Sequence, residues 1–321
     1  NADAGADLVA GLLADNADNA ANIINNLTAD DFASVLASDN LTADDAAKLF
    51  QSDNITNDLL GAALQSDTLS VEKAAEILQS DSVDAAKAAQ VLASDQFTSK
   101  KAAELLSQGT LSTDKAAAML SSGNLSADKA ANILREESLG ADRAASFLNS
   151  DQMATGKAAE ILNSDSIDAD KGAAILQSSS IGADKGAEIL QSNSIDANKG
   201  AAILASDNLD ADKGADILGS DKIDASTAAS ILDSSAIDAT KAAQIVDKPA
   251  LSAKKSADIL GAVEKTKAGA ILEGVSNTKV EGVVENMPED KLVERLPEMS
   301  AEKLHTLNPQ VLFDNLPSVP T

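Results

Sequence analysis

The chain has 321 residues, and its 51 acidic and 25 basic side chains give a formal net charge of −26 at neutral pH. This balance disfavours nucleic acid as a partner, because binding phosphate requires a basic surface. The absence of Cys excludes disulfides and thiolate metal sites, and no apolar run is long enough to predict a membrane span. The acids are dispersed along the whole chain, so they do not form a disordered acidic tail. Solubility alone is one explanation of this acidity, and a saline or extracellular setting is the other.

The chain begins at Asn1 without Met, so we expect that a leader has been removed or that the sequence is a piece of a longer polypeptide. Residues 1–26 form an imperfect start, with one apolar cluster around Leu8, Val9, Leu12 and Leu13. The ends of repeat arrays are usually atypical because they cap the stack. We therefore interpret residues 1–26 as an N-terminal cap.

Residues 27–264 repeat a 14-residue unit seventeen times without insertion or deletion. The copy that begins at Ile167 reads IDADKGAAILQSSS, and its residues are numbered here as positions 1 to 14 of the repeat. Such a short fixed period is typical of a repeat array.

Each unit predicts one short helix. Position 2 is Ser, Thr or Asp in 14 of 17 copies, which is the pattern of an N-cap, and position 4 is often acidic, which suits the helix dipole. Apolar residues at positions 6, 7, 9 and 10 share one helical face. The Ser, Asp, Asn and Gly residues at positions 12 to 14 end the helix.

A helix this short requires neighbours, so the repeat predicts a stack in which each helix packs on those before and after it. Position 7 is Ala in 16 of 17 copies, including Ala173 and Ala187, and the uniformity indicates a steric limit on the distance between helices. Position 6 is reduced further to Gly in four consecutive copies, including Gly172 and Gly186, which indicates close helix approach or a changed curvature of the array. The fold class is therefore all-α, a right- or left-handed α-solenoid.

Position 5 is Lys or Arg in 13 of 17 copies, including Lys171 and Lys185. A cation in the first turn opposes the helix dipole, so an ordered partner is expected. One candidate set is the carboxylates at positions 2 and 4, and the other is the carboxylates at position 13 of a neighbouring loop: Asp81, Asp95, Asp151, Asp165, Asp207 and Asp221. The alternative is a solvated row of lysines, which stabilises little.

After Glu264 the period shortens, and residues 265–321 form repeats of 12 residues with a Pro-rich end. Units such as MPEDKLVERLPE place Pro288 at a helix start and Pro297 after a helix. This tail resembles the superhelical N-terminal domain of bacterial magnesium channels, which is also built from short helices with Pro-Glu-rich starts. The resemblance implies a compact coil of short helices and carries over no function.

Several loops collect acids, and oxygen-rich loops can bind Ca²⁺. The calcium candidates are Asp165, Asp168, Asp170, Asp207, Asp210 and Asp212. Their spacing does not match an EF-hand, and capping explains position 2, so we favour caps over calcium. His305 is the single histidine and cannot build a metal site or a catalytic triad alone, and no catalytic or nucleotide-binding motif is present. We expect neither an enzyme nor a bound cofactor.

Four Asn-X-Ser/Thr sequons begin at Asn26, Asn40, Asn54 and Asn124, and the first three lie 14 residues apart. The repeat itself generates them, because position 14 is often Asn and position 2 is often Ser or Thr. They become glycosylation candidates if the protein is secreted.

Two classes of function remain. The first is a non-enzymatic structural protein of the cell surface or the extracellular space, which binds copies of itself, or other surface proteins, in a filament or envelope layer. The second is a solenoid scaffold that binds a peptide or protein. Recognition surfaces are usually rich in aromatic residues and Arg, whereas positions 8 and 11 here carry small or well-solvated residues. This pattern favours the structural class.

Overall fold

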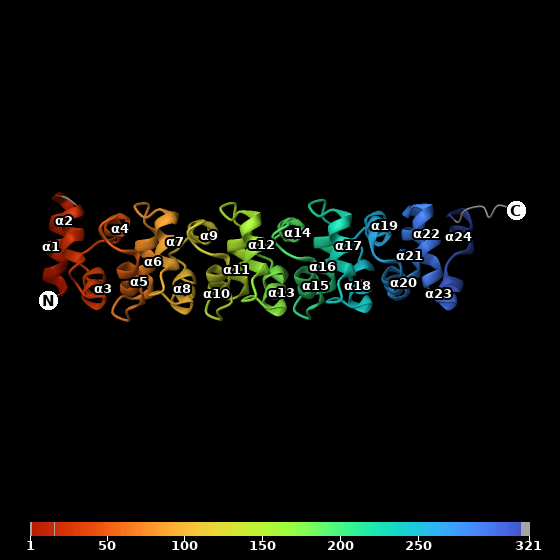
Figure 1. The fold of residues 1–321 in the computed structure, drawn as a ribbon, viewed down its shortest axis with the longest axis horizontal. Helices are drawn as coiled ribbons and strands as arrows, with labels where there is room; N and C mark the ends of the chain where they lie inside the picture. Colours follow the sequence, from red (N-terminus) through yellow and green to blue (C-terminus); the bar gives the residue numbers. More distant parts are fainter. Residues whose placement is uncertain (1, 16, 316–321) are drawn as a thin grey trace. The chain divides into compact units, whose positions relative to one another are not determined.

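The computed structural model describes residues 2–15 and 17–315, which form 24 α-helices, one 3₁₀-helix and no strand (Figure 1). The all-α repeat fold expected from the sequence is confirmed. In the first half the helices are α1 (Ala2–Asp15), α2 (Ala17–Ile24), α3 (Ala29–Ala37), α4 (Ala43–Gln51), α5 (Asn57–Gln65), α6 (Val71–Gln79), α7 (Ala85–Ala93), α8 (Ser99–Leu106), α9 (Thr113–Ser121), α10 (Ala127–Leu134), α11 (Ala141–Asn149) and α12 (Thr155–Asn163). The second half contains α13 (Ala169–Gln177), α14 (Ala183–Gln191), α15 (Ala197–Ala205), α16 (Ala211–Gly219), α17 (Ala225–Asp233), α18 (Ala239–Val246), α19 (Ala253–Ala262), α20 (Lys265–Gly274), α21 (Asn277–Asn286), α22 (Glu289–Arg295), η1 (Leu296–Glu298), α23 (Ala301–Thr306) and α24 (Pro309–Asn315).

The chain divides into two compact units, Asn1–Ile167 and Asp168–Thr321. The division coincides with the start of a repeat, since Ile167 is a position-1 residue. The first unit contains α1 to α12 and the second contains α13 to α24. Both units are built by the same local rules.

The helix starts follow the capping pattern. The position-2 side chain accepts a hydrogen bond from the backbone N–H three residues later in the copies with Ser, Thr or Asp, as in Thr28 from Asp31 N at 3.1 Å. The three copies with Gly140, Ala154 or Gly182 at position 2 lack this side-chain bond. The predicted role of position 2 is thus confirmed, and the missing caps fall where no capping side chain exists.

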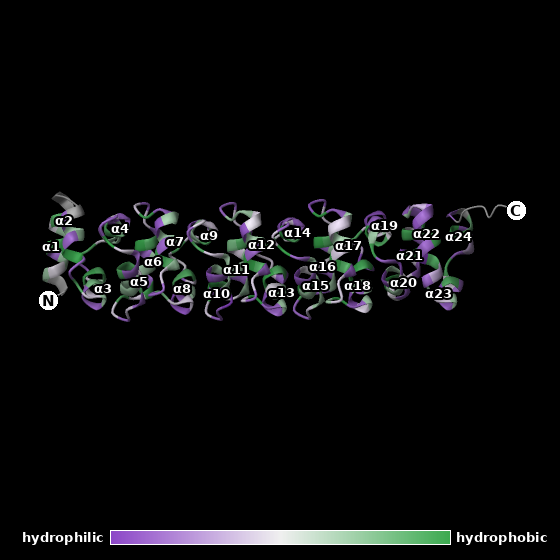
Figure 2. Ribbon diagram, viewed as in Figure 1, coloured by the Kyte–Doolittle hydropathy of each residue, from purple (hydrophilic) through white to green (hydrophobic). Residues whose placement is uncertain are grey.

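The core is formed by positions 1, 6, 7, 9 and 10 of the repeats. Ala173 and Ala187 at position 7 are fully buried, and so are Ile175 and Leu176 at positions 9 and 10. Figure 2 shows hydrophobic and hydrophilic residues side by side on these helices, as an amphipathic repeat requires. The helical face predicted from the spacing is the buried face.

The main packing partner of a helix is the second helix along the chain, not the next one as the sequence led us to expect. In the first unit α3 packs on α5 and α4 on α6, and in the second unit α13 packs on α15 and α14 on α16. Smaller contacts join helices three apart, such as α4 with α7 and α14 with α17. One turn of the coil therefore takes between two and three helices.

The glycines at position 6 allow this packing to be close. A Cβ on Gly186 would lie 3.2 Å from Cδ1 of Ile217, and a Cβ on Gly214 would lie 3.2 Å from Cδ1 of Ile245. In both pairs the isoleucine occupies position 9 two repeats later. Gly172 is buried at the same position of α13. The expected close approach is confirmed for Gly186 and Gly214.

The short-period tail continues the same packing with shorter connections. Helices α18 and α20 pack on each other, as do α19 and α21, so the partner remains two helices away after the period changes. Val275, Met287 and Met299 mark the 12-residue steps and are buried. The tail is thus a coil of short helices, as expected.

Candidate functional site

The position-5 cations form the most regular polar feature of the fold. The Nζ atoms of several of these lysines donate to the carbonyl of the position-1 residue two repeats earlier. The distances are 3.2 Å for Lys73 to Leu41, 2.7 Å for Lys129 to Phe97, 2.6 Å for Lys157 to Leu125, 2.8 Å for Lys213 to Ile181, 2.9 Å for Lys241 to Leu209 and 2.5 Å for Lys255 to Ile223. We call each of these bonds a lysine staple.

Most staples reach a second carbonyl at the end of a helix. Lys241 Nζ also lies 3.2 Å from the carbonyl oxygen of Ser206, and Ser206 is the C-cap residue of α15. Carbonyls at a helix C-terminus have no partner within the helix and carry the negative end of its dipole. The staple satisfies those carbonyls, and this offsets the cost of placing a cation in the first turn of its own helix. Lys171 and Lys185 occupy the same position of their helices and are partly buried.

The expected partners of these lysines, carboxylates at positions 13, 2 and 4, are replaced by backbone carbonyls in the staples named above. Lys101 comes within 3.7 Å of the position-13 residue Asp67, which is an ion pair of the expected kind. At Lys115, burial lowers the pKa of the ammonium, while the nearby Asp81 and Asp84 act to raise it. For the lysines that form staples, the expected order was right but the expected carboxylate acceptors were wrong, whereas Lys101 has an expected acceptor.

Arginine makes the same connection with more bonds. The Arg143 guanidinium donates to the carbonyls of Leu106, Gln108 and Leu111, and its Cζ lies 4.9 Å from the centroid of the Phe147 ring. A planar guanidinium can serve three acceptors at once, which a lysine ammonium does less rigidly.

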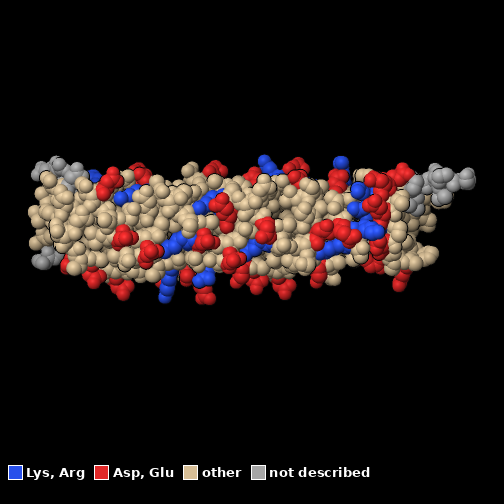
Figure 3. Space-filling model, viewed as in Figure 1, with Lys and Arg blue, Asp and Glu red and all other residues tan. Residues whose placement is uncertain are grey.

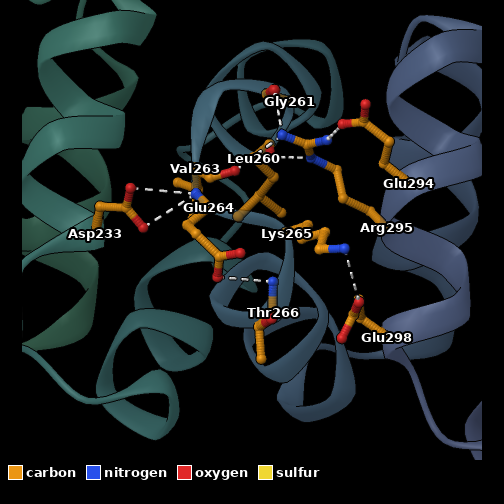
Figure 4. Close-up of polar contacts among 10 residues, drawn as sticks. All are labelled: Asp233, Leu260, Gly261, Val263, Glu264, Lys265, Thr266, Glu294, Arg295 and Glu298. Atoms are coloured by element: carbon orange, nitrogen blue, oxygen red, sulfur yellow. Dashed lines mark hydrogen bonds and ion pairs between the residues drawn. The ribbon is translucent and has the colours of Figure 1, made fainter.

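Arg295 repeats this arrangement in the tail, although it does not stand at position 5 (Figure 4). Its Nε donates to Leu260 O at 2.9 Å, and its Nη2 donates to Gly261 O at 2.7 Å and to Val263 O at 2.9 Å. The side chain is 4 % exposed, and its Nη1 lies 2.8 Å from Glu294 Oε2. The tail thus keeps cations on loop carbonyls after the sequence period has changed.

A second set of bonds joins position 12 to position 4. The serine hydroxyl donates to the carboxylate two repeats earlier, as in Ser80 to Asp44 at 2.7 Å and Ser220 to Asp184 at 2.7 Å. The same hydroxyl oxygen accepts the N–H of position 14, as in Lys222 N to Ser220 Oγ at 3.1 Å. Where Lys248 replaces the serine, its ammonium pairs with Asp212 at 3.0 Å. Position 12 is therefore a connector as well as a helix end.

A third set joins position 11 to the N-cap three repeats later. Gln191 Oε1 accepts from the backbone N–H of Asp224 at 2.8 Å, and its Nε2 donates to Asp224 Oδ2 at 2.9 Å. An acid takes this role at Asp233, which accepts at 3.0 Å from the backbone N–H of Glu264, the N-cap of α20. Sequence analysis missed both the second and the third set. The second set of bonds could have been suspected from the sequence, because position 12 is Ser in 13 of 17 copies.

The calcium candidates have other partners. Asp168 and Asp210 accept bonds from the N–H groups of Lys171 and Lys213 as N-caps. Asp170 accepts the Ser206 hydroxyl. Asp212 pairs with Lys248, and Asp165 and Asp207 are exposed in their loops. Across residues 2–15 and 17–315, no three His or acidic side chains are grouped so that they could hold a metal ion.

The four sequon asparagines are all exposed at the loops between helices. Asn26 Nδ2 donates to Asn22 O at 2.8 Å, and Asn124 Nδ2 donates to Ala86 O at 3.3 Å. The sequon hydroxyls of Thr28 and Thr42 serve as N-caps. Exposure leaves these asparagines accessible to a glycosylating enzyme.

On the visible face, acidic and basic side chains are scattered among uncharged residues (Figure 3). His305 is exposed on α23. Within the part of the chain that the structure describes, no helix is both long enough and apolar enough to cross a membrane.

No known protein family matches this chain, and no curated protein or solved structure is significantly similar to it. The likeness of the tail to the magnesium-channel domain therefore rests on the residue pattern alone.

Proposed function

We propose that the protein is a non-enzymatic structural component of the cell surface or extracellular space, which associates with copies of itself in a filament or layer. The observation that carries the proposal is the use of the polar repeat positions. Positions 2, 4, 5, 11 and 12 hold the repeats to one another through the bonds described above, so the most regular chemistry of the chain supports its own architecture. The magnesium-channel resemblance adds only the short-helix architecture to this proposal.

Self-association follows from the uniformity of the repeats. Successive repeats present similar outer residues. A patch that attracts one repeat of another chain can therefore attract several repeats of that chain, and the weak contacts add up. The net charge of −26 opposes this contact through long-range repulsion. Assembly should therefore strengthen with salt or Ca²⁺, which screen or bridge the acids.

Light scattering and electron microscopy of the full chain test this function. We expect larger particles or filaments as NaCl or CaCl₂ is raised, and fewer when salt is removed and a chelator is added. A chain that stays monomeric at high concentration throughout the series contradicts the proposal. Mass spectrometry of native material tests whether Asn26, Asn40, Asn54 and Asn124 carry glycans, as a surface location would allow.

The alternative is a scaffold that binds a basic peptide. A surface cleft of about 370 Å³ in the first unit is lined by Asp44, Glu76 and Asp81, together with Gln79, Ser80 and Thr110. Three carboxylates in one cleft favour a cationic ligand. Titration with a Lys-rich peptide at low and high salt distinguishes the two functions, since a specific scaffold retains binding at moderate salt.

A further inference from the structure

The bonds from position 12 to position 4 are interrupted at one place in the first unit. They join Asp30 to Ser66, Asp44 to Ser80 and Asp58 to Ser94, and they resume with Asp114 to Ser150 and Asp128 to Ser164. In the three copies between, the residues in register are Glu72 with Gln108, Ala86 with Ser122 and Lys100 with Glu136. No bond of this set therefore crosses the chain between Ser94 and Asp114.

Each of the three pairs lacks its bond for a reason of its own. Ala86 offers no acceptor to the Ser122 hydroxyl. Gln108 Nε2 donates at 3.1 Å to a carbonyl of the helix that precedes it, that of Glu104. Lys100 and Glu136 carry opposite charges but form no ion pair with each other. The interruption is thus caused by a change of residue types over three consecutive copies.

The bonds from position 11 to the N-cap are interrupted in the same region. The last one before the interruption and the first one after it are Gln79 Oε1 with Ser112 N at 2.7 Å and Ser121 Oγ with Ala154 N at 3.0 Å. Between them Ala93 has no side-chain hydrogen-bonding group, and the Ser107 hydroxyl donates to Glu104 O at 2.6 Å in its own helix. At Thr113, the first residue of α9, neither set of bonds crosses the chain.

Cations hold this place instead. Lys115 and Lys129 staple the turns at Val83 and Phe97, and Arg143 donates to the loop that follows α8. Asn124 Nδ2 also reaches the carbonyl of Ala86 at 3.3 Å. The connection across the start of α9 is therefore made by the apolar core, three cations and one amide.

Opening at this place removes one packing partner from each adjacent helix. Helix α8 packs on α6 and α10, and α9 packs on α7 and α11. The two helices have only 8 and 9 residues, and helices of this length have little stability without tertiary contacts. In a repeat array the stability is a sum of terms between neighbours, so the interface with the fewest bonds opens most readily.

We propose that the loop between α8 and α9, residues 107–112, is a built-in joint of the first unit. The array opens there, with local melting of α8 and α9, while the repeats on both sides stay folded. This inference goes beyond the proposed function and does not depend on self-association. In a structural protein, such a joint fixes the place at which the array yields to heat or load.

The chain itself shows how the joint can be closed. Asp170 accepts the Ser206 hydroxyl at 2.7 Å while its carbonyl accepts Asn208 Nδ2 at 3.3 Å, which is the arrangement around Ala86 with the acid present. The Ser234 hydroxyl donates to Asn198 Oδ1 at 2.7 Å, so asparagine also serves. Ala86→Asp and Ala86→Asn should therefore each give Ser122 the acceptor that it lacks, and the second adds no charge.

Hydrogen exchange of the full chain, followed by mass spectrometry, tests the joint at a salt concentration where the chain is monomeric. Ala86→Asp is measured in the unmodified chain and in a Ser122→Ala background, because the second has the same charge and helix change without the donor. Circular dichroism establishes that each variant keeps its helix content.

In the unmodified chain we expect a minimum of protection at α8 and α9, with slower exchange in α6 and α11 on either side. Ala86→Asp and Ala86→Asn should slow the exchange of α9 about tenfold, as a restored hydrogen bond predicts. The exchange of α5 should not change, and Ala86→Asp in the Ser122→Ala background should not slow α9.

Two results overturn the joint and leave the proposed function untouched. Protection that rises evenly from α3 to α11 in the unmodified chain means that the array opens only by fraying. If Ala86→Asp has no effect on α9, or slows it equally with and without Ser122, the missing bond is not the source of the weakness.

Discussion

The Ser206 hydroxyl donates a hydrogen bond to Asp170 Oδ1 over 2.7 Å, although the two residues are 36 apart in the sequence. Ser206 caps the end of α15 and Asp170 lies in the first turn of α13, so the bond joins two helices that pack directly. The same pair of positions is joined repeatedly along the chain. The bond therefore shows how a loop residue in this fold serves its own helix and a distant one.

Ser206→Ala should lower stability by about 1 kcal/mol, because the bond to Asp170 and the acceptance of the Asn208 N–H are both lost. Ser235→Ala in the loop after α17, where the side chain is exposed, is the control and should change little. Urea unfolding followed by circular dichroism measures both. Equal effects of the two substitutions would mean that the position-12 bond contributes nothing.

Lys129→Met should destabilise the chain by about 1.5–3 kcal/mol, which is the usual range for a hydrogen bond to a charged group. The methionine keeps much of the aliphatic stem but leaves the carbonyls of Phe97 and Ser94 without their cation. Lys222→Met is the matched control, because Lys222 is about half exposed and makes one ion pair at 3.7 Å. Hydrogen exchange should show faster opening of the Ser94–Phe97 loop in the first variant alone.

Thr227→Lys should add a staple that the native chain lacks. Thr227 stands at position 5, where its short side chain cannot reach Ile195, and Ile195 is 7 % exposed, whereas Leu209 is fully buried beneath the staple from Lys241. We expect the Ile195 amide to exchange about tenfold more slowly in the variant, which corresponds to about 1.4 kcal/mol. The Leu209 amide serves as the internal control, and an unchanged exchange rate at Ile195 would contradict the staple's role.

The comparison of position 5 with position 7 shows what the sequence could and could not predict. Ala173 was placed correctly in the core because burial follows from composition and helical period, both of which are local. The lysine staples were indicated by the regularity of the cation, but their acceptors depend on how many helices complete one turn. That number is set by helix crossing geometry in three dimensions, and a repeat length does not contain it.

The hydrogen bonds of positions 11 and 12 were not predicted from the sequence for the same reason. Ser206 and Gln191 looked like ordinary loop and helix-end residues, since their partners lie two and three repeats away, respectively. A 14-residue period predicts that equivalent residues of all repeats have equivalent partners. It does not predict how many repeats away each partner lies. The regularity was therefore visible in the sequence, while the identity of the partners depends on how the helices pack in three dimensions.

Ser256→Ala should stabilise the protein by about 1–2 kcal/mol. The Ser256 hydroxyl is fully buried and makes no hydrogen bond, and most other copies have Ala or Gly at the same position. Removing an unsatisfied buried polar group removes its desolvation cost. Thermal unfolding by circular dichroism should show a higher midpoint, and a lower midpoint would show that the hydroxyl has a partner in solution.

Asp224→Asn should weaken the dependence of stability on acid. The N–H of Thr227, followed by the hydroxyl of Ser226, holds the pKa of the Asp224 carboxyl far below its usual value. A folded pKa below the unfolded value of about 3.9 gives stability that is complete above about pH 4 and is lost as the pH falls toward the folded value. Asparagine keeps a capping oxygen but does not titrate.

Thermal unfolding at about pH 7, 4 and 2 measures this effect. The unmodified chain and the variant should differ least at low pH, because the protonated aspartate has lost its advantage there. A constant difference at all three pH values would mean that the charge of Asp224 does not contribute.

The staples all point toward the N-terminus, and this direction has a consequence for biosynthesis. Lys129 closes the turn at Phe97, which the ribosome has made 32 residues earlier. A turn that is closed by a staple therefore stays unfinished in the nascent chain until two further repeats have been made. Each further repeat completes an older one, so maturation trails synthesis by a constant length of chain and proceeds as an advancing front from the N-terminus.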